Sequence, residues 1–143
     1  MQRDFARAPR GEIIEDTKAG VKFARINVIG AICNEKCYGI ECYKQATDSE
    51  FFEYWFENCF LKKIPKGSTA ILDNARYHRK EPLRKMATGK VRLLFLPPYS
   101  PDYNPIEKTW ANMKRYLRNN IKKFQSVDSG IYSYFNLIEN KFN

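Results

Sequence analysis

The sequence has little histidine and cysteine: one histidine, His78, and four cysteines at positions 33, 37, 42 and 59. Cysteines this sparse do not make a disulfide framework, so we expect reduced thiols. The first three cysteines are spaced by four and five residues and the single histidine is distant, which fits no common pattern of zinc ligands. The composition therefore argues against a disulfide-stapled scaffold and against a structural zinc site.

Long apolar runs are also missing. No stretch approaches the ~20 apolar residues that a membrane-spanning helix needs, and the first residues lack the apolar region of a signal peptide. We therefore expect a soluble, cytoplasmic protein with no membrane partner.

Acidic residues are scarce relative to basic ones, with 16 Asp and Glu against 25 Lys and Arg, a formal net charge of +9. Lysine and arginine that neutralise phosphates release counterions, which drives association with nucleic acid. DNA or RNA is the first partner to consider, and a solvated basic surface that only aids solubility is the alternative on charge alone.

The chain has 143 residues, 43% of them hydrophobic and 15% aromatic. This length supports one buried core, and the apolar content excludes a disordered basic tail. We expect a single domain over residues 1–143, with a basic loop region at 1–20 and a helical tail at 126–143.

Hydrophobic periodicity predicts a strand over residues 21–32 that returns through a turn at 34–36 into a second strand ending at 43. A capping box that begins at Thr47 predicts a helix with an aromatic face up to residue 60. A strand at 68–72, a helix at 81–87 and a strand at 91–96 follow. This order indicates an α/β fold with a mixed sheet flanked by helices.

Two carboxylates stand at places where sites form in such folds. Asp73 follows the strand at 68–72. Glu107 lies in the first turn of a helix whose start is predicted by Asn104 as N-cap and Pro105 as first helical residue. Glu107 is about 100° away from the apolar stripe of that helix, at the edge of the core. Two neighbouring carboxylates with no basic group between them repel each other, and the usual remedy is a divalent cation that accepts hard oxygen ligands, a role that suits magnesium.

Two motifs around these acids carry a family resemblance. Residues 71–78 read ILDNARYH, and residues 94–110 read LFLPPYSPDYNPIEKTW, with Lys114 following. The opening residues 3–11, RDFARAPRG, resemble a basic loop of the same family. From about Gln2 to Arg118 the chain resembles the DDE transposases of bacterial insertion sequences, in the Tc/mariner superfamily.

The resemblance implies a ribonuclease-H-like catalytic core whose three acids hold two Mg²⁺ (or Mn²⁺) ions. Asp73 matches the second acid and Glu107 the third, and both would be catalytic metal ligands. Asn74 and His78 match the polar residues that accompany the second acid. Two ions ~4 Å apart stabilise the attacking and leaving oxygens of a phosphodiester displacement.

The implied partner is DNA, at transposon ends and at the target. The candidate contacts with its backbone come from the basic loop and from the helix that carries Glu107. They are Arg7, Arg10, Lys108, Lys114, Arg115 and Arg118.

One departure from the family concerns the first acid, which belongs on a core strand before the basic loop. Asp4 and Asp16 are the nearest acids, and neither matches that strand position. An upstream helix-turn-helix region is not seen either. We therefore expect an N-terminally truncated transposase domain, with its first core strand missing or incomplete, either a remnant or one product of a split or frameshifted gene.

For this chain alone we expect DNA binding, weak metal binding and little or no cleavage. A homodimer or a separately encoded N-terminal part would be its protein partner. Two alternatives stay open: an active nuclease of the same fold that uses another acid, and a non-enzymatic basic protein that binds nucleic acid through charge.

Overall fold

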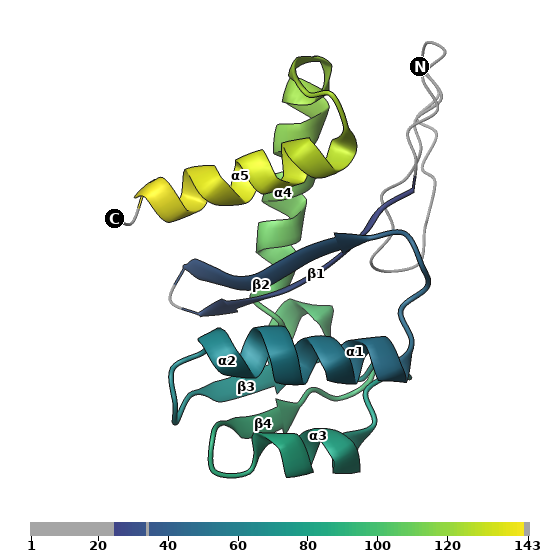
Figure 1. Ribbon diagram of the computed structural model, residues 1–143, viewed down its shortest axis with the longest axis vertical. Helices are drawn as coiled ribbons and strands as arrows, with labels where there is room; N and C mark the ends of the chain where they lie inside the picture. Colours follow the sequence, from purple (N-terminus) through teal and green to yellow (C-terminus); the bar gives the residue numbers. More distant parts are fainter. Residues whose placement is uncertain (1–24, 34, 142–143) are drawn as a thin grey trace.

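The computed structural model describes residues 25–33 and 35–141. Its first half begins with a hairpin of β1 (Asn27–Cys33) and β2 (Lys36–Tyr43) and continues into α1 (Ser49–Trp55). Figure 1 shows this hairpin crossing the middle of the molecule, with α1 on one side and the C-terminal helices on the other. The predicted basic loop, with Arg7, Arg10 and the alternative acids Asp4 and Asp16, lies outside the described residues.

The hairpin forms because alternate residues of both strands are apolar and the chain reverses at Glu35, whose φ is 66°. The register pairs Asn27 with Tyr43 and Cys33 with Lys36, with an irregularity between Ile29 and Ala31. The indole Nε1 of Trp55 donates a hydrogen bond of 2.6 Å to the carbonyl oxygen of Gly39, which fixes α1 against the hairpin. The predicted hairpin is confirmed, with its first strand beginning at Asn27; residues 21–24 of the predicted strand lie outside the described residues.

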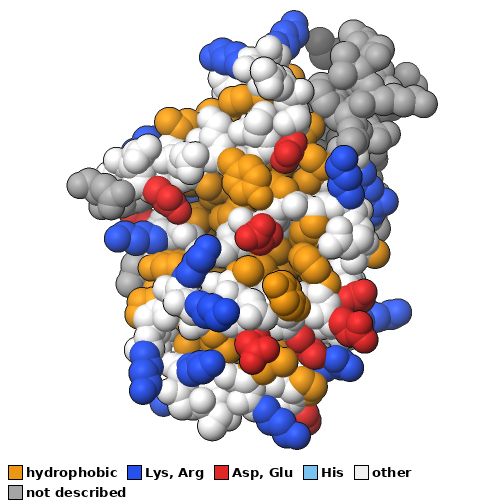
Figure 2. All heavy atoms as spheres, in the orientation of Figure 1, with side chains coloured by type: hydrophobic (Ala, Val, Ile, Leu, Met, Phe, Trp, Pro, Cys, Tyr) orange, Lys and Arg blue, Asp and Glu red, His pale blue; other side chains and the backbone are white. Residues whose placement is uncertain are grey.

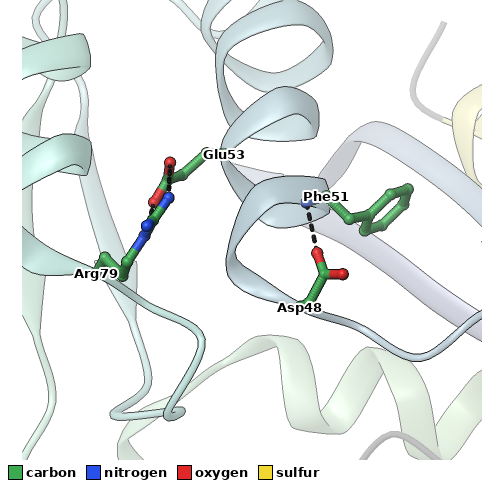
Figure 3. A network of polar contacts seen from close by, with 4 residues as sticks. All are labelled: Asp48, Phe51, Glu53 and Arg79. Carbon is green, nitrogen blue, oxygen red and sulfur yellow. Dashed lines mark hydrogen bonds and ion pairs between the residues drawn. The ribbon is translucent and has the colours of Figure 1, made fainter.

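The helix after the hairpin begins one residue later than the predicted capping box. Asp48 is the N-cap, and its Oδ1 accepts a hydrogen bond of 2.8 Å from the Phe51 backbone N–H (Figure 3). The hydroxyl of Thr47 instead contacts the hydroxyl of Tyr43. The helix then widens into a π-helical segment, Phe56–Phe60, and ends as α2 (Leu61–Lys63).

A parallel pair of strands follows. β3 (Thr69–Leu72) and β4 (Arg92–Phe95) pair in parallel, with α3 (Lys80–Ala87) as the connection between them. Their inward residues pack with the apolar face of α1 and of the π-helical segment into a first core cluster, in which Phe56 and Leu83 are fully buried. The sequence predicted both ends of each of these three elements to within one residue.

The last third of the chain is helical. A 3₁₀ turn (Pro101–Tyr103) leads into α4 (Ile106–Asn120), a second 3₁₀ turn (Ile121–Lys123) follows, and α5 (Val127–Lys141) closes the described chain. α4 and α5 pack on the hairpin in a second core cluster. Their close approach leaves no space at Gly130, where a Cβ would lie 2.7 Å from the Leu117 side chain.

The α/β class is confirmed, but the strands are not joined into one mixed sheet. In the described ranges, β1 pairs with β2 and β3 pairs with β4, giving an antiparallel and a parallel two-stranded sheet. Hydrophobic periodicity identifies strands but not their partners, because pairing depends on contacts that are distant along the chain.

Candidate functional site

A cavity of about 470 Å³ lies between the two sheets. It is lined by β1, by β3 with the loop that follows, by the aromatic face of α1 and the π-helical segment, and by the first half of α4. Of the residues predicted as functional, the cavity is lined by Asp73, His78, Glu107 and Lys114.

Asp73 follows the last residue of β3, at the carboxyl end of the parallel pair, and its side chain is 40% exposed. Its Oδ1 accepts a hydrogen bond of 3.2 Å from the Ala75 backbone N–H. This short turn orients the carboxylate, which is the Asx-type role that favours aspartate at such a position. The loop geometry therefore presents one carboxylate to the cavity.

His78 supports Asp73 from the buried side. Its Nδ1 lies 3.0 Å from the Asp73 carbonyl oxygen and 3.2 Å from Oδ1 of the same residue, and its side chain is 7% exposed. A carbonyl oxygen only accepts, so Nδ1 carries the proton in this contact. The imidazole packs against the rings of Phe52 and Tyr77, at centroid distances of 4.2 and 4.7 Å, and its Nε2 is buried with no hydrogen-bond partner.

Arg79, next to His78, anchors the same loop to α1. Its Nε and Nη2 donate to the two carboxylate oxygens of Glu53 at 2.6 and 2.7 Å (Figure 3). These hydrogen bonds and the charge of Glu53 raise the pKa of the guanidinium. A two-pronged contact of this kind fixes orientation as well as distance, so it restrains the loop that carries Asp73.

Glu107 reaches the cavity from the first turn of α4, where its side chain is half-buried. The Glu107 backbone N–H donates to the Asn104 carbonyl oxygen at 3.1 Å. The Asn104 side-chain Oδ1 accepts from the Ile106 backbone N–H at 3.4 Å. A negative charge near a helix N-terminus is favoured by the helix dipole. The helix begins at Ile106, one residue after the predicted start at Pro105.

The structure thus brings Asp73, His78 and Glu107 to one cavity. Asn74 is exposed and is not among the residues that line it. The role of each of these residues in catalysis or metal binding stays a prediction.

The predicted basic residues of α4 differ in their surroundings. Lys114 lines the cavity, whereas Lys108, Arg115 and Arg118 are exposed. At about 100° per residue, Lys114 and Arg118 share a face with Glu107, and the other two lie about a quarter turn away.

The donor chemistry of the cavity suits a hard divalent cation, because carboxylate oxygens are the ligands that magnesium prefers. The number of ligands is short: among residues 25–33 and 35–141, no group of three or more His, Cys, Asp and Glu side chains is arranged to hold an ion. Magnesium often uses one or two carboxylates, with waters and substrate phosphates completing its shell. The pair therefore suits at most a weakly held ion, which is the expectation for a chain in which two of the family's three acids were identified.

Two positioning residues escaped the sequence analysis. Glu53 and Arg79 are 26 positions apart, and nothing local marks them as a pair. The available signal in the sequence was a glutamate within a predicted helix face that is otherwise aromatic. Glu53 is 9% exposed, and a carboxylate buried to this extent needs a partner of opposite charge.

No helix in the part of the chain that the structure describes is long and apolar enough to cross a membrane.

Two comparisons with known proteins bear on this cavity. Residues 1–129 match the family described as DDE superfamily endonuclease. The uncharacterized protein y4pE/y4sA of Sinorhizobium fredii is 31% identical over 99 residues, which cover 67% of this chain and 71% of that protein.

Proposed function

The chain belongs to the DDE superfamily of endonucleases, and from this membership we propose that it is the catalytic part of an insertion-sequence transposase of the Tc/mariner branch. Its reaction is the metal-dependent cleavage of DNA at transposon ends and the joining of the freed strand to target DNA. One observation carries the proposal: Asp73 and Glu107 line the same cavity although they are 34 positions apart in the sequence.

Asp73 and Glu107 are the proposed ligands of Mg²⁺ or Mn²⁺. When bound, the ions would stabilise the attacking and leaving oxygens of an in-line phosphodiester displacement. The chain's own part is positional: His78 holds Asp73 through Nδ1, and the Arg79–Glu53 pair restrains the loop between them.

DNA is the proposed substrate, and α4 is its proposed contact. Lys114 lines the cavity two turns along α4 from Glu107, so a phosphate near the carboxylates would lie near an ammonium group. Figure 2 shows Lys and Arg side chains spread over one face of the molecule, with hydrophobic and acidic side chains among them. The order of a hairpin, a helix and a parallel pair of strands supports a ribonuclease-H-like fold.

For the chain alone we propose weak metal binding and little cleavage. The described residues contribute two carboxylates, and an ion held by two ligands is too loosely placed to stabilise the charge that develops in the displacement.

Calorimetry with Mn²⁺ tests the site. We expect weak, saturable binding that Asp73→Asn and Glu107→Gln each reduce at least tenfold. Glu57→Gln, an exposed carboxylate on the π-helical segment, is the matched control and should leave binding unchanged. Unchanged affinity in the two cavity variants would favour a basic protein that binds nucleic acid through charge alone.

Incubation with labelled duplex DNA and Mn²⁺ tests the reaction. We expect no more strand breaks than with Asp73→Asn. Cleavage that requires Asp73 would mean that another acid completes the site, and Asp4→Asn and Asp16→Asn variants would then identify it.

A further inference from the structure

The loop at 97–103, between β4 and α4, runs from one proposed metal ligand to the other. Just before it, the Leu96 backbone N–H donates to the carbonyl oxygen of the residue that precedes Asp73, at 2.8 Å. Just after it, the Asn104 carbonyl oxygen accepts from the Glu107 backbone N–H at 3.1 Å. The loop is therefore held at both ends next to a carboxylate of the cavity.

Prolines and local hydrogen bonds stiffen this loop. Pro97, Pro98 and Pro101 each have a fixed φ. The Ser100 hydroxyl donates to the Pro98 carbonyl oxygen at 3.2 Å. The Tyr103 backbone N–H donates to the Ser100 carbonyl oxygen at 3.3 Å. A partner of the loop would thus meet side chains on a backbone that is already ordered, which lowers the entropic cost of binding.

Two tyrosines of this loop carry the most exposed large hydrophobic side chains in the part of the chain that the structure describes. Tyr99 is 96% exposed and Tyr103 is 71% exposed. The backbone of Tyr99 also has a φ of 56°, a left-handed conformation that is costly for a bulky side chain and that clusters at binding sites. The loop therefore offers two flat, apolar ring faces to a partner.

The charges around the loop indicate which part of a nucleic acid it can contact. Residues 93–107 include no lysine or arginine, and Asp102 adds a negative charge next to Tyr103. Phosphates are repelled there and attracted to α4, where Lys108 is exposed in the first turn and Lys114 lines the cavity. A nucleic acid at this place would contact α4 with its phosphates and the loop with its bases.

Bases present their faces to protein rings only where they are unpaired. Within a duplex, each base face is covered by its stacked neighbours, and proteins reach the base edges through the grooves. Aromatic side chains therefore stack on bases of single-stranded segments. This contact tolerates any sequence, because every base has a π-face.

We propose that Tyr99 and Tyr103 stack on unpaired bases of DNA that adjoin a duplex bound along α4. The preferred substrate is then a duplex with a single-stranded segment beside Asp73 and Glu107. The choice of DNA as the partner rests on the proposed function, whereas the stacking rests on the two exposed rings and the missing positive charge of their loop.

The fluorescent base 2-aminopurine reports the stacking, because its fluorescence falls when an aromatic ring stacks on it. The probe is a forked DNA hairpin, whose open end continues into two unpaired thymine tails with one 2-aminopurine in each. The comparison is a blunt hairpin with the same duplex. Each is titrated with the whole chain in EDTA, which removes any metal-dependent cleavage. We expect the forked hairpin to bind about tenfold more tightly, with saturable quenching.

Variants of the two tyrosines test the rings without disturbing the fold. Asparagine adopts a positive φ more readily than most residues, so Tyr99→Asn removes the ring and keeps the backbone conformation. Tyr99→Asn and Tyr103→Ala should each lower the affinity for the forked hairpin about tenfold and reduce the quenching. The melting temperature and the affinity for the blunt hairpin should not change. Tyr99→Phe keeps the ring and should bind as the parent does. Tyr54→Ala removes a 66% exposed tyrosine of α1 and is the matched control, with no expected effect.

The salt dependence separates stacking from charge. Removing a ring releases no counterion, so Tyr99→Asn should leave the slope of log affinity against log salt unchanged. A smaller slope in this variant, equal binding of the two hairpins by the parent, or the same loss in Tyr54→Ala would overturn the stacking. So would a dimer in light scattering that Tyr99→Asn dissociates, because a second copy would then cover the ring.

Mn²⁺ affinity, measured separately by calorimetry, tells this proposal apart from the proposed metal site. Equal binding of the forked and blunt hairpins, with Mn²⁺ affinity that Asp73→Asn lowers, would refute the stacking and keep the metal site. A preference for the forked hairpin that Tyr99→Asn removes, with Mn²⁺ affinity that Asp73→Asn does not change, would keep the stacking and refute the metal site.

Discussion

His78 is held by contacts on both sides of its ring, with Asp73 at Nδ1 and the rings of Phe52 and Tyr77 around it. It is the chain's one histidine, and it is buried rather than placed on the surface to touch phosphate. The imidazole therefore contacts Asp73, and under the proposed function its effect on metal binding would be indirect.

Replacing His78 should weaken the metal site through Asp73. Partners that orient a metal ligand are worth about 10–100-fold in affinity. We expect His78→Leu to lower Mn²⁺ affinity in that range by calorimetry, and His78→Asn, whose amide can donate from near the place of Nδ1, to restore most of it. Equal losses in both variants, at equal melting temperatures, would contradict a role through Nδ1.

Burial also changes the chemistry of two cysteines on β2. It raises the pKa of Cys37 and of Cys42 to about 11, with smaller contributions from nearby acidic residues. A rise of about two units leaves about a hundredfold less thiolate at a given pH. Iodoacetamide at pH 8 should therefore modify both cysteines about a hundredfold more slowly in the folded chain than in urea, as measured by peptide mass spectrometry. Equal rates in the two states would show that β2 does not protect them.

At the scale of elements, the start of α1 depends on Asp48. An N-cap side chain that satisfies a free N–H contributes about 1 kcal/mol. Asp48→Ala should lower the free energy of unfolding by about that amount in urea titrations. Glu50→Gln, an exposed change in the same turn, should stay within about 0.5 kcal/mol of the parent, and a similar loss there would assign the effect to charge instead of the cap.

The helices also show what local patterns can and cannot predict. Apolar spacing predicted α1 and α4 because each buries one face. The sequence pattern could not predict that Asp48 and not Thr47 is the N-cap, because both residue types cap helices. The contact between Thr47 and Tyr43, which is distant from the local pattern, decides between them. The π-helical segment was equally unpredictable, because one extra residue in a turn leaves the apolar spacing almost unchanged.

Under the proposed function, α4 should provide the DNA contact. Lys114→Ala and Arg118→Ala each remove a positive charge from the face that carries Glu107. Each substitution that removes a phosphate contact should reduce the slope of log affinity against log salt by about 0.9. Lys62→Ala and Lys63→Ala, which change exposed residues of α2, are the controls for net charge and should reduce the slope less. Equal effects at both places would favour diffuse electrostatic binding.

For the whole molecule, stability should fall at alkaline pH. The pKa values of Cys37 and Cys42 are about 11 in the fold and near 9.0 otherwise, so the fold favours the protonated thiols. This contribution is complete below pH 9 and is lost as the pH rises toward 11. Urea titrations should show a falling free energy of unfolding across that window, and Cys37→Ala with Cys42→Ala should flatten the fall. An unchanged fall in the double variant would assign it to tyrosines such as Tyr43 and Tyr134, whose pKa values burial also raises.

The arrangement of the two sheets is the part of the fold that the sequence predicted least well. It identified each of the four strands and placed Asp73 at a strand end, because these are local properties. Whether β1 meets β3 depends on what lies between them, and the described residues leave a cavity there. The same limit explains why the Glu53–Arg79 pair was missed, while the Asp73 and Glu107 positions could be proposed from motifs.

The outer edge of β2, on the side of the hairpin away from β1, is covered by α5. On β2, the backbone N–H of Cys42 donates to the Tyr132 hydroxyl at 3.2 Å, and α5 packs along that strand. Pairing of a further strand along this border is therefore obstructed. In the described residues β1 has no strand partner besides β2, so a hairpin that paired with another strand along β1 could not extend through β2 into a filament.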